Sequence, residues 1–220
     1  MIEIIILGFV LGIQHAFDSD HVVAVSTMVN ETKSLKKSSK IGAIWGIGHT
    51  FTLFIGGLLL MTFKTSIPEQ LALSFEFLIG IVLVLLGLNV YLKIRKEKIH
   101  LHRHAHEGTE HAHLHSHEKS LSHKHAHIKK PLLIGMLHGL AGSAGLMLLV
   151  LGTVQSIAQG LFYILIFGLG SIIGMSLIST LIGIPFLLTS KISHLQNTVH
   201  FTTGTLSILI GIKMMLEIRF

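Results

Sequence analysis

The chain has 220 residues, of which 50% are apolar and only 13% are charged, and its mean hydropathy is +0.70. This composition excludes an ordinary water-soluble globule and indicates an integral membrane protein. The formal charge of +6 does not imply a nucleic-acid partner, because the basic residues fall in loops between apolar segments, where membrane orientation explains them. Cysteine is absent, so any metal must be bound by nitrogen and oxygen ligands.

Six stretches of the chain are apolar and long enough to cross a bilayer, which takes about 20 residues per helix. We therefore predict an all-α, polytopic membrane protein with spans near residues 2–28, 41–62, 72–94, 131–152, 157–184 and 198–218. Residues 131–190 contain no charged side chain, which indicates two spans joined by a tight turn near residues 152–160. The first span has no basic segment before it, so we expect it to stay in the mature protein.

The basic residues are distributed unevenly among the predicted loops. Of the 17 Lys and Arg residues, 14 follow or flank the loops after the first, third and fifth spans, whereas only Lys64, Lys213 and Arg219 lie on the opposite side. Cytoplasmic loops carry an excess of Lys and Arg. The sequence therefore predicts that loops one, three and five are cytoplasmic and that both termini lie outside.

Segments of the first half recur in the second half at nearly constant offsets of 123, 122 and 124 residues. The matching pairs are residues 11–15 with 134–138, residues 45–49 with 167–171, and Gly80 and Gly87 with Gly204 and Gly211. Because each unit holds three spans, the second copy must enter the membrane from the opposite side, as in the 3+3 inverted repeats of secondary transporters. We predict a first three-helix repeat at 1–95, a loop at 96–130 and a second repeat at 131–220. Small residues that recur for close helix packing are the alternative explanation.

Four ionisable or metal-ligating side chains interrupt the first predicted span, namely His15, Asp18, Asp20 and His21. One Asp at the centre of a membrane helix costs about 2.5–3.5 kcal/mol, so a compensating partner is expected, and a bound cation is the natural one. On an ideal helix His15, Asp18 and His21 fall within about 120° of one another, whereas Asp20 points elsewhere unless the helix distorts between Phe17 and His21. A cluster held only by its own hydrogen bonds, or one lying outside the membrane, is the alternative.

Two further histidines are candidate ligands. His49 follows Gly48, which would let two helices approach closely, and His138 is a secondary candidate. Either could instead be a core histidine that hydrogen-bonds across helices. His194 and His200 are expected to be unligated surface residues. Imidazole nitrogen combined with carboxylate oxygen suits Ni²⁺, Co²⁺ and Zn²⁺, whereas all-oxygen sites suit Mg²⁺ or Ca²⁺.

The loop between the two halves is rich in histidine. Eleven of the 17 histidines lie there, often in alternation with other residues: His100, His102, His104, His106, His111, His113, His115, His117, His123, His125 and His127. A composition this rich in histidine is typical of metal-binding tracts, and most of these imidazoles are neutral and free to coordinate at pH 7.5. Because no periodic apolar face is present to fold the segment, we predict a flexible, metal-buffering loop.

These features resemble the nickel/cobalt permeases, the NiCoT and broader NicO group, and most closely its short UreH-type members. His15, Asp20 and His21 fit the family's His-x4-Asp-His signature, and Gly48-His49-Thr50 is similar to its Gly-His-Ser/Thr element. Residues 138–143 and 167–175 also resemble segments of the UreH branch. The resemblance implies transport of Ni²⁺ or Co²⁺ across a prokaryotic plasma membrane, with His15, Asp20 and His21 as signature residues.

We therefore expect a secondary transporter, not an enzyme, that moves a divalent cation, with Ni²⁺ or Co²⁺ favoured and Zn²⁺ left open. Its partners would be the lipid bilayer, the metal ion and a candidate cytoplasmic metallochaperone, with no catalytic cofactor and no nucleic acid. One alternative is a membrane-anchored, urease-accessory-like protein that delivers metal through the His-rich loop. A membrane metalloenzyme that activates water is less favoured, because the sequence contains no HExxH-type motif. Metal preference, transport direction, coupling ion and oligomeric state stay open.

Overall fold

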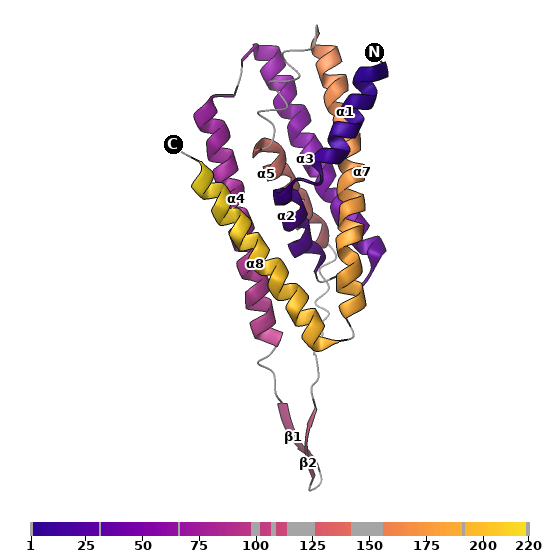
Figure 1. Cartoon of the computed structure of the whole chain (residues 1–220), viewed down its shortest axis with the longest axis vertical. Coiled ribbons are helices and arrows are strands. Elements are labelled where there is room, and N and C mark those ends of the chain that lie inside the picture. The colour runs from indigo at the N-terminus through magenta and orange to yellow at the C-terminus, as the bar shows by residue number, and fades with distance from the viewer. Residues whose placement is uncertain are drawn as a thin grey trace.

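The computed structural model describes residues 2–30, 32–65, 67–97, 102–106, 109–113, 126–141, 156–190 and 192–218. Within these ranges the chain forms an elongated bundle of helices, from one end of which a two-stranded ribbon projects (Figure 1). The elements are the helices α1 (Ile2–His15), α2 (Ser19–Val29), α3 (Leu35–Phe63), α4 (Glu69–Glu97), α5 (Ala126–Ala141), α7 (Ile157–Thr189) and α8 (Ser193–Glu217), and the strands β1 (His102–His106) and β2 (Thr109–His113).

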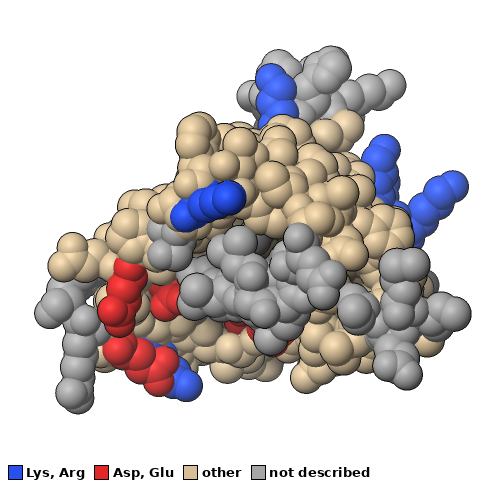
Figure 2. Space-filling model, turned by 90° about the horizontal axis from the view of Figure 1, so that it is seen from above, with Lys and Arg blue, Asp and Glu red and all other residues tan. Residues whose placement is uncertain are grey.

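The helices have the lengths and surfaces of a membrane protein. Four of those described, α3, α4, α7 and α8, are long and apolar enough to cross a bilayer, and Ile5–His15 adds a shorter apolar segment. Large apolar side chains such as Phe63, Leu188 and Leu216 point outward, 71–77% exposed. The view from above looks along the bundle onto one of its ends, where the described Asp and Glu side chains (red) and Lys and Arg side chains (blue) lie mostly near the edge (Figure 2). The outward-pointing apolar side chains form a surface suited to lipid rather than water.

The first predicted span, residues 2–28, is not one continuous helix. Helix α1 ends at His15, and Ala16, Phe17 and Asp18 form a turn before α2 begins. The backbone N–H groups of these three residues donate to carbonyls three positions earlier, and Asp18 then takes an extended ψ of 145°. The break therefore lies at 16–18. For the case in which Asp20 is a ligand, the sequence predicts a distortion slightly later, between Phe17 and His21.

The ribbon formed by β1 and β2 lies in the His-rich segment, which the sequence predicts to be flexible. The strands pair antiparallel, with His102 opposite His113 and His104 opposite His111. Strand pairing uses backbone groups and does not need an apolar face, so these ten residues form strands although no apolar periodicity is present. The flexibility of the loop stays a prediction. His127 lies within α5, whereas His100, His115, His117, His123 and His125 lie outside the described residues.

Two pairs of helices are in backbone contact at corresponding glycines of the two halves. Gly12 of α1 packs on the carbonyl oxygen of Phe167 in α7, and Gly135 of α5 packs on the carbonyl oxygen of Trp45 in α3. A Cβ atom at either glycine would clash with the facing carbonyl group. Small residues are what allow membrane helices to approach this closely, so these two positions set the spacing of the helices around the bundle centre.

Helices α4 and α8 meet through four glycines in a reciprocal pattern. A Cβ atom at Gly80 would lie 2.8 Å from the carbonyl oxygen of Gly211, and one at Gly211 would lie 2.5 Å from that of Gly80. The same exchange relates Gly87 and Gly204, at 2.6 and 3.2 Å. These contacts pack the third predicted span directly against the last one along the left side of Figure 1.

We predict that Gly12→Ala and Gly135→Ala each lower the thermal unfolding midpoint of the purified protein in detergent. The added methyl group would force α1 from α7, or α5 from α3, and overpacking of this kind costs about 1–3 kcal/mol. Gly56→Ala is the matched control, since a Cβ there would meet nothing within 4 Å. An unfolding midpoint equal to that of wild type for both variants would contradict the close packing described here.

Candidate metal centre

The break between α1 and α2 brings two histidines of one chain segment together. His15 is the last residue of α1 and His21 lies in the first turn of α2, and their ring centroids are 4.5 Å apart. A turn closed by short-range hydrogen bonds replaces helical continuity here, so the two rings approach edge to face at an interplanar angle of 68°. His21 is 2% exposed, and its environment is therefore almost entirely protein.

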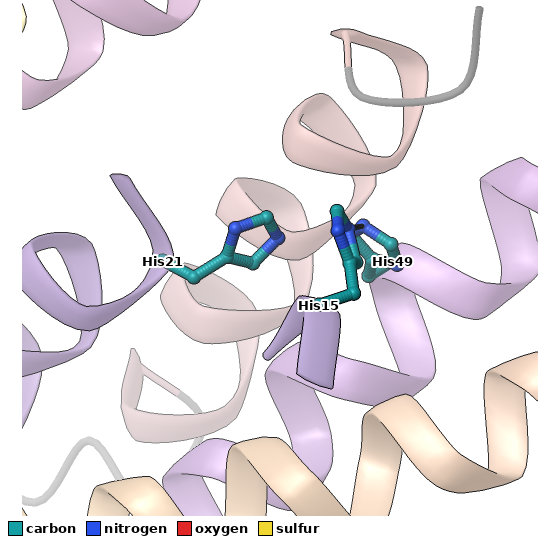
Figure 3. A group of neighbouring side chains, drawn as sticks. All are labelled: His15, His21 and His49. Carbon is teal, nitrogen blue, oxygen red and sulfur yellow. Dashed lines mark hydrogen bonds between the residues drawn. The ribbon is translucent and has the colours of Figure 1, made fainter. Parts of the chain in front are cut away.

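His49 of α3 completes the group from a separate part of the chain. It is fully buried, and its ring centroid lies 5.1 Å from that of His15 and 5.3 Å from that of His21. Figure 3 shows the three rings converging from different segments of the backbone. Each histidine can offer one nitrogen such that all three atoms lie within 4.8 Å of one another, an arrangement able to hold a metal ion.

The carboxylate of Asp18 decides which nitrogen of His15 is free. His15 Nδ1 lies 2.8 Å from Asp18 Oδ2, and a carboxylate can only accept, so in the neutral ring Nδ1 carries the hydrogen. Nε2 of His15 then holds a lone pair, and Nε2 of His49, 3.2 Å away, is the donor. A cation held between these two nitrogens would require the other tautomer of His49, with its hydrogen on Nδ1, which is buried and has no hydrogen-bond partner among the described residues.

Asp20 orients His21 in the same way. His21 Nδ1 lies 3.1 Å from Asp20 Oδ1, which leaves the lone pair of the neutral ring on Nε2. Nε2 of His21 is buried and has no hydrogen-bond partner among the residues that the structure describes. An unsatisfied buried polar atom costs about 1–3 kcal/mol. Metal-ligating histidines characteristically donate their other N–H to a carboxylate or carbonyl, so this geometry is that of a prepared ligand.

The two aspartates also form a second group with His21. One oxygen of Asp18, one of Asp20 and one nitrogen of His21 lie within 4.8 Å of one another. This group is more open, because the Asp18 side chain is 53% exposed and that of Asp20 is 23% exposed. The structure thus brings together all five residues that the sequence selects as principal candidates, His15, Asp18, Asp20, His21 and His49, and it places the carboxylates on the outer side of the imidazoles.

Two further residues line the centre. His138 of α5 is 1% exposed, and its ring centroid lies 5.3 Å from that of His21. Trp45 of α3 is fully buried and contacts both rings, at centroid distances of 5.2 Å to His21 and 5.3 Å to His138. Trp45 does not appear among the candidates predicted from sequence. The sequence could have pointed to it, because it is the chain's only tryptophan and lies one helical turn before His49.

The remaining two histidines differ from each other. His194 is exposed, as expected. His200 is only partly exposed rather than a surface residue, because its Nε2 donates to the carbonyl oxygen of Asn30 at the end of α2, at 3.1 Å, and its ring contacts Phe186. This interaction ties α8 to α2 away from the candidate centre, and His200 therefore has a packing role. That it is not a metal ligand stays a prediction.

Comparison with known proteins places this centre in a family. The family model of the NicO proteins, described as high-affinity nickel-transport proteins, matches residues 1–216. The chain belongs to the NicO family. The resemblance inferred from the histidine motifs is thereby confirmed, and NicO membership together with the apolar helices identifies the chain as a membrane protein of a nickel-transport family.

Two curated relatives agree with that membership. The urease accessory protein UreH of Bacillus sp. (strain TB-90) is 43% identical over 215 residues, which cover 98% of this chain and 91% of that protein. The nickel transporter NixA of Staphylococcus aureus (strain NCTC 8325 / PS 47) is 37% identical over 51 residues, or 23% of this chain and 15% of that protein. No solved structure matches the chain.

We predict that the two aspartates contribute unequally when Ni²⁺ is used as the probe. Asp20→Ala should weaken Ni²⁺ binding by about 10–100-fold, the usual effect of losing the partner that orients a ligand. Asp18→Ala should have a smaller effect, because water can reach the half-exposed position and replace the carboxylate. Equilibrium dialysis of the purified protein measures both, with the exposed Glu217→Ala as the control. Complete loss of binding in Asp20→Ala would instead identify a direct ligand.

Proposed function

We propose that this protein transports Ni²⁺ across the membrane as a secondary transporter and holds the dehydrated ion at the imidazoles of His15, His21 and His49. In this proposal Asp18 and Asp20 keep the ligand nitrogens in the required tautomers and offset the charge of the ion. Membership of a nickel-transport family favours a carrier over an enzyme.

One observation carries the proposal. Three imidazoles from α1, α2 and α3, of which His21 and His49 are buried and His15 is 19% exposed, bring one nitrogen each within 4.8 Å of the others, although nothing in an apolar bundle requires them there. Ionisable residues inside membranes are costly and mark ion pathways by default. Nε2 of His21 has no hydrogen-bond partner among the described residues, and an ion bound there would be a partner for it.

The donor set favours first-row divalent ions. Imidazole nitrogens suit Ni²⁺, Co²⁺ and Zn²⁺, and the general affinity order does not separate nickel from cobalt by ligand type alone. Nickel is preferred here because the matching family and the relative NixA are both described by nickel transport. Cobalt is proposed as a second substrate, and zinc as a competitor for the same nitrogens.

Paired contacts support the proposed 3+3 inverted repeat of six spans. The contact of Gly12 with Phe167 corresponds to that of Gly135 with Trp45, since both residues shift by 123 or 122 positions. The reciprocal glycine contacts of α4 and α8 follow the same exchange of halves. In secondary transporters built this way the substrate site lies at the interface of the repeats, and the repeats rock about it.

We propose the prokaryotic plasma membrane as the location, with the His-rich loop in the cytoplasm and both termini outside, as the basic residues predict. The ribbon of that loop and the connection between α7 and α8 project from the same end of the bundle in Figure 1, which is compatible with this orientation. The membrane potential alone offers a driving force, because moving two charges through 100 mV is worth about 4.6 kcal/mol. The loop would buffer the metal and exchange it with a cytoplasmic metallochaperone.

We predict that His21→Ala abolishes Ni²⁺ flux into vesicles reconstituted with the purified protein. Loss of this side chain removes the one imidazole common to both groups of donor atoms. His194→Ala, a change of an exposed histidine, should keep wild-type flux. Flux in His21→Ala equal to wild type would remove the site assignment.

A second candidate function is metal delivery, which the description of UreH as a urease accessory protein favours. Deletion of residues 100–127 separates the two functions. If the protein is a transporter, the deleted variant should keep most of its Ni²⁺ flux in vesicles, because the candidate centre lies in other helices. If it is a delivery protein, the deleted variant should lose the ability to pass Ni²⁺ to a recipient protein. Loss of flux on deletion, with the protein still folded, would count against the transport mechanism proposed here.

A further inference from the structure

His138 has a free ligand nitrogen that the three-histidine centre does not use. Its Nδ1 lies 3.1 Å from the carbonyl oxygen of Ile134, one turn earlier in α5. A carbonyl oxygen can only accept, so Nδ1 carries the hydrogen and Nε2 of the neutral ring holds the lone pair. That Nε2 is buried and has no hydrogen-bond partner among the described residues. The ring is thus prepared as a ligand in the way His15 and His21 are.

His21 stands between His138 and the other two histidines. Its ring centroid lies 4.5 Å from that of His15, 5.3 Å from that of His49 and 5.3 Å from that of His138. His138 is in neither of the two groups of donor atoms that can close around one ion among the described residues. It is therefore adjacent to the three-histidine group without belonging to it.

The two halves of the chain place His15 and His138 in corresponding surroundings. The positions differ by 123 residues, the offset of the first repeated segment. His15 contacts the ring of Phe167 at a centroid distance of 5.5 Å, and His138 contacts Trp45 at 5.3 Å. Phe167 and Trp45 also correspond to each other in the repeat. One half thus supplies His15, and the other half supplies its counterpart.

We propose that His138 and His21 form a second binding station for the transported divalent cation, which accepts the ion as it leaves His15 and His49. The inference rests on the transport function proposed above. In the transfer, the ion keeps its bond to His21 Nε2, gives up the nitrogens of His15 and His49 and gains Nε2 of His138. No proton has to move on His138, because Nε2 already holds the lone pair. Since both stations use His21, they are occupied in turn and the chain binds one ion.

The test compares binding and flux in full-length protein, with Ni²⁺ as the transported ion and Co²⁺ as the spectroscopic probe. His138→Leu should still bind one Ni²⁺, with an affinity within about tenfold of wild type, because the first station is intact. Its initial flux in vesicles should fall by at least about tenfold, because the second station, into which the ion would move, is missing a ligand. His194→Ala is the control for both measurements.

A second pair of variants distinguishes a ligand from a packing residue. His138→Leu alone should leave the ligand-field absorption of bound Co²⁺ unchanged. The His49→Ala background leaves only His15 and His21 in the first station, so the ion then relies more on His138, and the same substitution should alter that absorption and weaken binding. A role in packing alone would not make the spectral effect depend on His49.

The outcomes separate this inference from the function on which it rests. Wild-type flux in His138→Leu, while the wild-type protein binds and transports Ni²⁺, would overturn the second station and leave the transport proposal standing. An unchanged Co²⁺ spectrum when His138→Leu is added to His49→Ala would also overturn it. Absence of Ni²⁺ and Co²⁺ binding by the wild-type protein would overturn the transport proposal and this inference together.

Discussion

The candidate centre depends on one kind of interaction, the hydrogen bond that His15, His21 and His138 each make on the side away from the other rings. Asp18 holds Nδ1 of His15, Asp20 holds Nδ1 of His21, and the Ile134 carbonyl holds Nδ1 of His138. Each bond leaves a lone pair on the nitrogen that points inward. Around the buried rings of His21 and His138, bulk water is not available to reset these tautomers, so their outer partners determine whether the inner nitrogens can replace the hydration shell of a cation. Water can reach the half-exposed Asp18 beside His15.

The break between α1 and α2 explains why the sequence predicts the residues of the centre better than their roles. His15, Asp18, Asp20 and His21 are conspicuous because charge is rare in an apolar segment. The ideal-helix arrangement predicted for them does not hold, however, because the extended backbone of Asp18 breaks the helix that it assumes. With the helix broken, both carboxylates lie beside the imidazoles, Asp18 at His15 and Asp20 at His21.

Contacts between distant parts of the chain account for most of what the sequence does not predict. The bundle of apolar helices, the candidacy of His49 and the glycine pattern follow from composition and spacing alone. The position of Trp45 against two histidines and the contact of His200 with Asn30 do not, because they depend on how α3, α5 and α8 pack after folding. The β1–β2 ribbon was missed for a different reason, since apolar periodicity carries no information about a hairpin without a core.

The shortness of the two helix pieces has an electrical consequence. Helix α1 has 14 residues and α2 has 11, lengths of about 21 Å and about 16 Å at 1.5 Å per residue, so neither alone crosses a hydrocarbon core of about 30 Å. Stacked end to end, they would put the intervening turn at intermediate depth. A cation arriving there from either compartment would traverse only part of the field, so the voltage drop would be divided between its uptake and its release.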